Sequence, residues 1–315
     1  MRYRRKLIAV IGGAVLVGAP IAAAVVLRPG PGLGASAAPP VEPAPISAGF
    51  PAPPSGAVVF SRQLGASALA LALVPNSGGR VLLQASVLGP QGKGVAGLRV
   101  AFALQGKTTA ATPCGPGCYR ATAATSGRPP RVELQVGGRL AAHWRVALPA
   151  AWPPPDASAL IASASKVWRS LRSLSFSETL ASSPRQSTSS TWRIQRPDRV
   201  AYQVKGGWAS VIVGERRWDR SPSDGRWVSS AQTRLTQPRP PWVSVRDAHL
   251  LGTATVQGRR AWRVSFFDPG TPGWFEIMLD RQTQHILELR MVATAHFMHD
   301  TYSSFDATPT ITPPR

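Results

Sequence analysis

The sequence predicts a mainly β protein with a membrane-spanning N-terminal helix and two folded parts. An uncharged apolar run follows a basic N-terminus. From residue 58 onward, short stretches of apolar or alternating residues dominate, and clusters rich in Gly, Pro, Asn and Asp separate them. This punctuation is typical of turns between antiparallel strands. Outside the N-terminus, one stretch near residue 160 repeats its apolar residues at helical spacing.

Residues 1–28 are predicted to be a signal anchor. The apolar run at 7–27 would span about 30 Å as a helix, enough to cross the hydrocarbon core of a bilayer. The alternative is a signal peptide that is cleaved, because small-residue sites such as 35–37 follow. The residues before the run include Arg2, Arg4, Arg5 and Lys6. This positive flank predicts a cytoplasmic N-terminus and extracytoplasmic folded domains, or secretion after cleavage.

Two linkers set the predicted domain boundaries. Residues 29–57 consist mainly of Pro, Ala and Gly, a composition that favours an extended spacer over a packed core. Residues 150–156 contain a run of prolines, which stops any regular element. The predicted folded domains are therefore a sandwich at 58–149 and a second domain at 157–312.

The charge balance indicates the kind of partner. The chain has 36 Lys and Arg against 15 Asp and Glu, a formal net charge of +21. The arginines are scattered along predicted strands and do not form a run or a helical stripe. We therefore expect attraction to anionic membrane or envelope surfaces, and no nucleic-acid partner.

Residues 58–149 have the pattern of a small antiparallel sandwich, with strand-length stretches such as "RVLLQASVLG" and "LRVAFALQG". Cys114 and Cys118 are expected to form a disulfide across a turn, because the chain is predicted to be exported. On "GKGVAGLRVAFAL" and "CGPGCYRA", this part resembles the Ig-like YtkA-like or CopC-like modules of bacterial extracytoplasmic and copper-resistance proteins. The resemblance implies an Ig-like sandwich. A CopC-like copper site implies histidines near the start of the domain, whereas this part has only His143, near its end.

A single amphipathic helix is predicted after residue 156. Asp156 is expected to cap it. Its apolar face is predicted to consist of Leu160, Ile161, Ala164, Val167, Trp168 and Leu171.

The rest of the chain, to residue 312, is predicted to be a succession of β-hairpins with turns such as "SPSDGR" and "DRQTQ". The stretches "RPDRVAYQV", "GERRWDRSPSDGRW" and "GWFEIMLDRQTQHILELRM", following one helix, resemble the LolA/LppX family of extracytoplasmic lipoprotein and lipid carriers. The resemblance implies a curved antiparallel half-barrel that wraps around the helix and leaves a hydrophobic groove.

Tryptophans are the candidate wall of that groove, because large rigid aromatic side chains suit contact with acyl chains. The alternative, which we favour for any single tryptophan, is that it fills a closed core. The candidates are Trp192, Trp208, Trp218, Trp227, Trp262 and Trp274. The Pro-rich break at 236–249 is predicted to be a loop or a short lid over one end of the barrel, or equally a long connection with no functional role.

The stretch "AHFMHDTYSSFD" raises the alternative of a soft metal site. On a strand, His296 and Met298 share one face and His299 lies on the other. His296 and Met298 could bind Cu(I), with Met291 or His285 as a third ligand. The simpler interpretation, which we favour, is an ordinary last strand of the barrel.

No catalytic motif is found, so we expect a protein that is not an enzyme and has no cofactor. The predicted function is a membrane-tethered extracytoplasmic binding protein, a carrier or sensor for a lipid, a lipoprotein acyl chain or another hydrophobic ligand. The alternatives are a copper-handling envelope protein and an envelope scaffold that binds no ligand.

Overall fold

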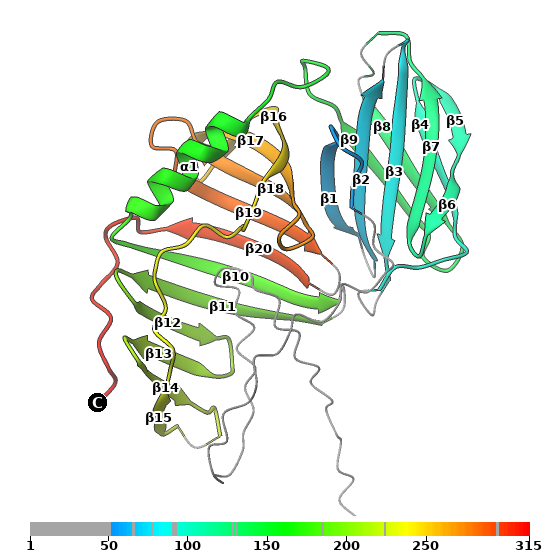
Figure 1. The fold of residues 1–315 in the computed structure, drawn as a ribbon. Coiled ribbons are helices and arrows are strands. Elements are labelled where there is room, and N and C mark those ends of the chain that lie inside the picture. Colours follow the sequence, from blue (N-terminus) through cyan, green and yellow to red (C-terminus); the bar gives the residue numbers. More distant parts are fainter. Residues whose placement is uncertain are drawn as a thin grey trace, which may run out of the picture.

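The computed structural model describes residues 52–64, 67–76, 78–89, 93–127, 129, 131–183, 186–223, 225–293 and 296–315. In these residues the protein is mainly β, with strands in three sheets and a single α-helix (Figure 1). The predicted anchor at 1–28 and most of the linker at 29–57 lie outside the described residues. Within them, no helix combines the length and apolar character that a membrane span requires.

The first domain is an antiparallel sandwich, as predicted. Its sheets have the orders β1-β2-β3-β7-β6 and β5-β4-β8-β9. The strands are β1 Val58–Leu64, β2 Ser67–Asn76, β3 Arg80–Leu88, β4 Arg99–Leu104, β5 Lys107–Ala110, β6 Thr112–Gly115, β7 Cys118–Ala124, β8 Arg131–Gly137 and β9 Ala142–Ala147.

Large apolar side chains from both sheets, among them Leu71, Phe102 and Leu134, fill the space between the sheets. The predicted disulfide between Cys114 and Cys118 is confirmed and closes the β6–β7 turn. The sandwich itself follows from the alternation in the sequence. The more specific likeness to YtkA-like or CopC-like modules stays a prediction.

The helix α1 spans Ser158–Ser170, where the sequence predicts it. Its N-cap is Ala157 and not Asp156, which corrects the expected cap by one residue. The Asp156 carboxylate still contacts the first turn of the helix. Its Oδ1 accepts hydrogen bonds from the N–H (3.3 Å) and the hydroxyl (2.7 Å) of Ser158. The predicted apolar face is largely confirmed, with Ile161, Ala164, Trp168 and Leu171 buried and Leu160 packed beside them.

The second domain is built on one eleven-stranded antiparallel sheet of order β15-β14-β13-β12-β11-β10-β20-β19-β18-β17-β16. The chain enters in the middle of the sheet at β10, pairs outward to β15, crosses to the opposite edge, and returns from β16 to β20, which pairs with β10. The strands β15 and β16 each have one neighbour, so the sheet is open and does not close into a barrel.

The bounds of these strands are β10 Ser173–Ser183, β11 Gln186–Gln195, β12 Arg199–Val204, β13 Ala209–Val213, β14 Arg216–Arg220, β15 Trp227–Ala231, β16 Arg246–Val256, β17 Arg259–Asp268, β18 Gly273–Asp280, β19 Ile286–Ala293 and β20 His296–Ser303. We call the segment 232–245, which joins β15 to β16, the crossing segment. It runs over the same face of the sheet as α1 (Figure 1).

Because side chains alternate along a strand, the sheet has two distinct faces. We call the face that packs on α1 the inner face, and the opposite face the outer face. The inner face carries most of the domain's core, which includes Phe176, Trp192, Phe266 and Phe275.

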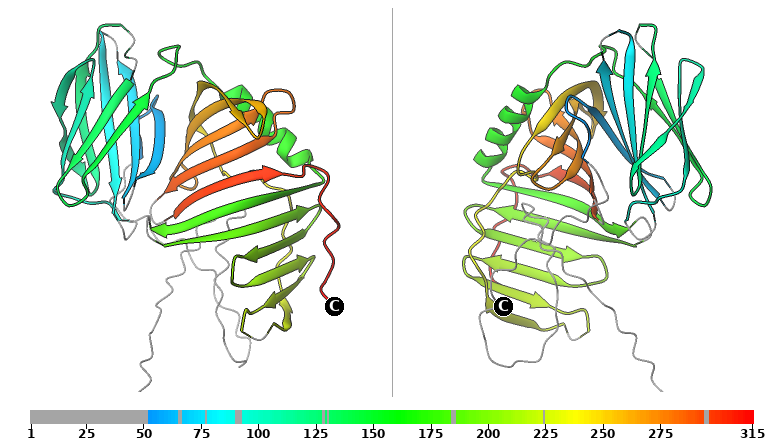
Figure 2. Two further views of the ribbon diagram at one scale, coloured as in Figure 1. Left: turned by 180° about the vertical axis from the view of Figure 1, so that it is seen from behind. Right: turned by 45° about the vertical axis from the view of Figure 1, so that its right-hand side comes forward.

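The sandwich packs against part of the outer face (Figure 2). Val59 on β1 and three alanines on β2 form one apolar layer with Phe267, Trp274, Val292 and Phe297 of the second domain. An Arg246 guanidinium nitrogen also donates a 2.7 Å hydrogen bond to the carbonyl of Pro53. The two domains are therefore joined by a buried apolar contact as well as by the linker at 150–156.

Candidate functional site

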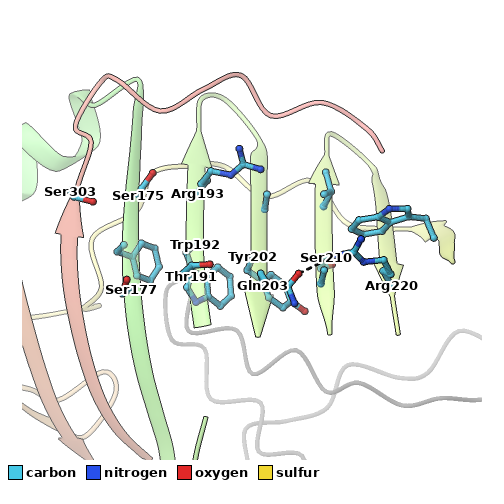
Figure 3. A pocket seen from close by; sticks show the side chains of 15 residues that line it. Ser175, Ser177, Thr191, Trp192, Arg193, Tyr202, Gln203, Ser210, Arg220 and Ser303 are labelled. Atoms are coloured by element: carbon cyan, nitrogen blue, oxygen red, sulfur yellow. Dashed lines mark hydrogen bonds between the residues drawn. The ribbon is translucent and has the colours of Figure 1, made fainter. Parts of the chain in front are cut away.

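The outer face of β10–β14 carries a pocket of about 490 Å³ that the sandwich does not fill. Its lining mixes polar and apolar residues, and the polar Ser175, Ser177, Thr191, Arg193, Gln203 and Arg220 come from four strands, β10, β11, β12 and β14 (Figure 3). Phe176, Trp192 and Tyr202 line the same strands, but they alternate with the polar residues and belong to the inner-face core. The pocket is therefore separate from the hydrophobic groove that the sequence predicts.

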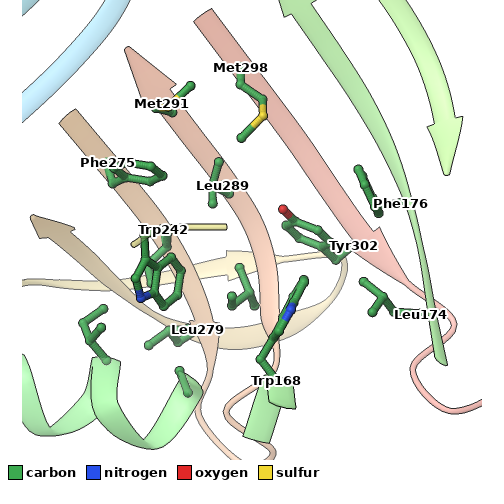
Figure 4. Packing of buried hydrophobic residues seen from close by; sticks show 14 of the residues in the cluster. Trp168, Leu174, Phe176, Trp242, Phe275, Leu279, Leu289, Met291, Met298 and Tyr302 are labelled. Carbon is green, nitrogen blue, oxygen red and sulfur yellow. The ribbon is translucent and has the colours of Figure 1, made fainter. Parts of the chain in front are cut away.

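The inner face is the candidate site for a hydrophobic ligand, and α1 alone does not cover it. A helix of 13 residues is about 20 Å long, whereas eleven strands extend over about 48 Å. The crossing segment provides further cover. Figure 4 shows Trp242 of this segment and Trp168 of α1 turned toward the side chains of the sheet.

The crossing segment contacts the sheet mainly through one aromatic side chain. Trp242 is 6% exposed and packs edge-on against Phe266, with ring centroids 5.2 Å apart, and against Phe275, at 6.5 Å. Next to it, the Asp268 carboxylate accepts hydrogen bonds from the backbone N–H of Val243, at 2.8 Å, and of Ser244, at 3.0 Å.

The segment is also held along its length: Gln237 N–H donates to the Pro197 carbonyl at 2.8 Å, and the Trp168 indole N–H of α1 donates to the Arg239 carbonyl at 2.6 Å. Its apolar contacts with the core come from Trp242 and the partly buried Leu235.

The large hydrophobic side chains that are most exposed lie near the two ends of the crossing segment. In the part of the chain that the structure describes they are Val228 (64%), Val243 (57%) and Val245 (36%). Val228 lies on the edge strand β15, and the two others lie on the crossing segment. Val243 and Val245 lie next to β16, and Val228 lies at the opposite edge of the sheet, so the three do not form one patch.

Beneath the cover, four aromatic rings form a continuous row across neighbouring strands. Tyr302 lies 5.2 Å from Phe176, Phe176 lies 5.7 Å from Trp192, and Trp192 lies 4.5 Å from Tyr202, measured between ring centroids. The register explains the row, because these residues are cross-strand partners on β20, β10, β11 and β12. The row makes this part of the inner face apolar, and its four side chains are all buried, at most 7% exposed.

Two carboxyl groups interrupt this apolar face. Glu178 on β10 is the cross-strand partner of Asp300 on β20, and the residues are 5% and 2% exposed. Burial raises the pKa of Glu178 to about 7, and burial together with the nearby Glu178 raises the pKa of Asp300 well above its ordinary value. Asp300 accepts a 2.6 Å hydrogen bond from the Tyr302 hydroxyl, and Glu178 accepts one from Ser190 at 3.2 Å. Both shifts favour the protonated, neutral form of each carboxyl group, which is the form compatible with apolar surroundings.

The structure separates the six tryptophans that the sequence proposes as a groove wall. Trp192 and Trp262 lie on the inner face, the second of them half-buried at the edge of the core. Trp274 lies on the outer face under the sandwich, and Trp227 lines the outer pocket. Trp218 is on the outer face of β14, opposite Val211, and Trp208 is in the turn before β13. Sequence reasoning did not place Trp168 and Trp242 in the wall, although both lie on the inner face.

The five candidate copper ligands do not all lie on one face of the sheet. His296, Met298 and Met291 share the inner face, and Met291 is the cross-strand partner of Met298. The Met291 sulfur, however, lies beside Gly273. A Cβ atom added to that glycine would be 3.3 Å from the sulfur. His299 lies on the outer face and hydrogen-bonds Glu288 at 2.9 Å, and His285 stacks on Phe305 with ring centroids 4.1 Å apart. Over the described ranges, no group of three or more His, Cys, Asp or Glu side chains is placed to hold a metal ion.

Comparisons with known proteins give likenesses among solved structures only. No protein-family model matches the chain, and no curated protein matches it. The lipoprotein LppX of Mycobacterium tuberculosis is 10% identical, with a TM-score of 0.39, over 49% of this chain and 97% of that one. LprF of Mycobacterium bovis is 12% identical, with a TM-score of 0.39, over 51% and 99%. A DUF1329 family protein of Desulfovibrio piger is 10% identical, with a TM-score of 0.25, over 47% and 90%. Likenesses at these TM-scores do not establish a shared fold, so the ligand of this chain has to follow from its own side chains.

Proposed function

We propose that this protein is an extracytoplasmic binding protein that holds a hydrophobic ligand, such as a lipid or a lipoprotein acyl chain, on the inner face of the eleven-stranded sheet. The observation that carries the proposal is the way in which the crossing segment covers the inner face. A single buried indole, Trp242, plugs an apolar face, while the neighbouring Val243 and Val245 are exposed to solvent. Trp242 and Leu235 are the side chains of the segment that pack on the core, fewer than α1 contributes, so displacing the indole costs less than displacing the helix.

The proposed binding step is an exchange of apolar groups. The hydrogen bonds from Val243 and Ser244 to Asp268 keep the β16 end of the crossing segment in place. Trp242 would leave its position beside Phe266 and Phe275, and an acyl chain would take that position and continue toward the aromatic row. Val243 and Val245, which are exposed close to Trp242, would then contact the ligand or the surface that delivers it. The protein acts as a carrier or sensor and not as an enzyme.

Tethering belongs to the same proposal. The N-terminal apolar run would hold the two domains at the outer side of the cell membrane, and the excess of basic residues would keep them near anionic lipid or envelope polymers. The sandwich would serve as a support for the binding domain, because an apolar layer already joins the two.

Binding can be measured with a fluorescent fatty acid as the probe and the full chain purified in detergent. We expect Trp242→Ala to bind the probe at least about fivefold more tightly than the wild type, because the ligand no longer has to displace the indole. Trp218→Ala, which removes an outer-face indole, is the matched control and should leave affinity unchanged. A wild-type chain that binds no probe, or equal affinities for all three chains, would contradict the proposal.

Copper binding is the second candidate, and one observation favours it. The Nε2 atom of His296 is buried without a hydrogen-bond partner in the described structure, on the same face as Met298. If the pair binds Cu(I), native mass spectrometry after anaerobic Cu(I) addition should show one copper that His296→Ala loses and His299→Ala keeps. Copper retained in His296→Ala would exclude this candidate.

A further inference from the structure

We infer that the outer pocket on β10–β14 is a second binding site, and that its ligand is a phosphate group carried next to hydroxyl groups, as in a glycerol phosphate. This inference does not depend on the hydrophobic ligand proposed for the inner face, because the two sites lie on opposite faces of the sheet. The inference rests on two arginine side chains that border a hollow lined in part by hydroxyl groups. None of the described residues that line the hollow is acidic.

The hollow exists because its floor is made of small side chains. In the middle of the pocket, the outer-face positions of β12 and β13 include Ala201 and Ala209, which are both buried, beside the larger Gln203 and Val211. On the β10 side the floor continues with Ser175, Ser177 and Thr191, whose hydroxyl groups can donate or accept hydrogen bonds. The result is a volume of about 490 Å³, within the usual range of about 300–1,000 Å³ for small-molecule sites.

Arg193 and Arg220 stand at opposite sides of this floor. They lie on β11 and β14, three strand spacings or about 14 Å apart at the backbone. Arg193 extends over the neighbouring strand (Figure 3) and makes no hydrogen bond or ion pair with any described residue. A guanidinium group whose donors are free in this way is suited to a phosphate or carboxylate ligand.

Arg220 is held in place but keeps donors available. One of its guanidinium nitrogens donates to the Gln203 side-chain oxygen at 3.3 Å, and its guanidinium carbon lies 4.9 Å from the centre of the Trp227 ring. Neither contact neutralises its charge. The positive groups therefore face a ligand from two sides, and Gln203 and the serine and threonine hydroxyls are left to bind the ligand's neutral oxygens.

This combination selects among ligand classes. A purely hydrophobic ligand would leave two arginines and several hydroxyl groups without partners, and a metal cation would be repelled. A neutral sugar would use the hydroxyl groups and leave the guanidinium charges without a partner. A phosphate beside hydroxyl groups satisfies both sets, and it can be presented by a free phosphorylated polyol or by the head group of a phospholipid.

The test is equilibrium binding of the full chain to two probes: sn-glycerol 3-phosphate in solution, and vesicles of phosphatidylglycerol with phosphatidylcholine vesicles as the neutral reference. We expect Arg193→Gln and Arg220→Gln each to weaken binding about tenfold. Arg216→Gln removes an equal charge from an exposed position on the same strand as Arg220, outside the pocket, and should change affinity less than about twofold.

The two probes separate the possible sources. Binding of the soluble phosphate that the pocket variants lose identifies a free phosphorylated polyol. Binding of phosphatidylglycerol vesicles alone, again lost in the pocket variants, identifies a lipid head group. Equal losses for Arg216→Gln and the pocket variants would show general charge attraction and overturn the inference, as would a wild-type chain that binds neither probe. Circular dichroism melting curves check that each variant is folded.

Discussion

Replacing Trp274 with alanine is expected to lower the free energy of unfolding by about 3–5 kcal/mol, the usual cost of removing a buried tryptophan. The side chain is 1% exposed and lies in the apolar layer between the sandwich and the outer face of β18. The substitution leaves a cavity at the domain interface, where Phe267 and Phe297 cannot both move to fill it. Urea unfolding, followed by circular dichroism, measures the change.

Trp218→Ala is the matched control for this prediction. Trp218 is also on the outer face of the same sheet, but it is half-buried and outside the apolar layer. Its removal should cost less than about 1 kcal/mol, in the range of surface substitutions. Because the layer joins the domains, we also expect the wild-type chain to unfold in one transition. Two separate wild-type transitions, with Trp274→Ala affecting neither, would contradict a stabilising interface.

The elements of the second domain were predictable because their patterns are local. The helix at Ser158–Ser170 has apolar residues at helical spacing, and its buried residues are those that the spacing selects. The strand β11 shows strict alternation near its end, where Trp192 and Ile194 are buried and Arg193 is exposed. In the last strand the sequence correctly assigned His296 and Met298 to one face and His299 to the other.

The face on which each tryptophan lies was not predictable, because some strands are buried on both sides. In β18 the residues from Gly273 to Ile277 are all buried, since the core covers the inner face and the sandwich covers the outer one. Alternation of polar and apolar residues is then lost, and Trp274 cannot be distinguished from Phe275 by pattern. Only the docking of the sandwich, a contact between residues far apart in sequence, explains why both are apolar.

The outer pocket could not be predicted for a related reason. Its floor combines small residues from β10 to β13, and Ser303 joins them through the pairing of β20 with β10. That pairing connects residues more than a hundred positions apart and leaves no mark in the local sequence. Arg193 and Arg220 are two of many arginines, and only the fold shows that they border one hollow.

Glu178 is expected to make the stability of the folded protein fall as the pH rises from about 4.5 to about 7. Burial raises its pKa from 4.5 to about 7 in the folded state. Between these values the unfolded chain has released the proton and the folded chain still holds it. The folded state binds more protons, so stability decreases with increasing pH. The expected loss is about 3 kcal/mol across this window, and Glu178→Gln should remove most of it.

Glu288→Gln provides the contrast, because the sign of its effect is opposite. Its hydrogen bond with His299 lowers the pKa of Glu288, so its contribution is present above pH 4.5 and is lost as the pH falls below that value. The free energy of unfolding of both variants and the wild type can be measured in urea from pH 3 to pH 8. The contribution of Glu178 should then change between about pH 4.5 and 7, and that of Glu288 below about pH 4.5. If Glu178→Gln left the wild-type pH dependence unchanged, Glu178 would be ionised in the folded protein. The inner face would then carry a charge beside the aromatic row, which would argue against an acyl chain lying over it.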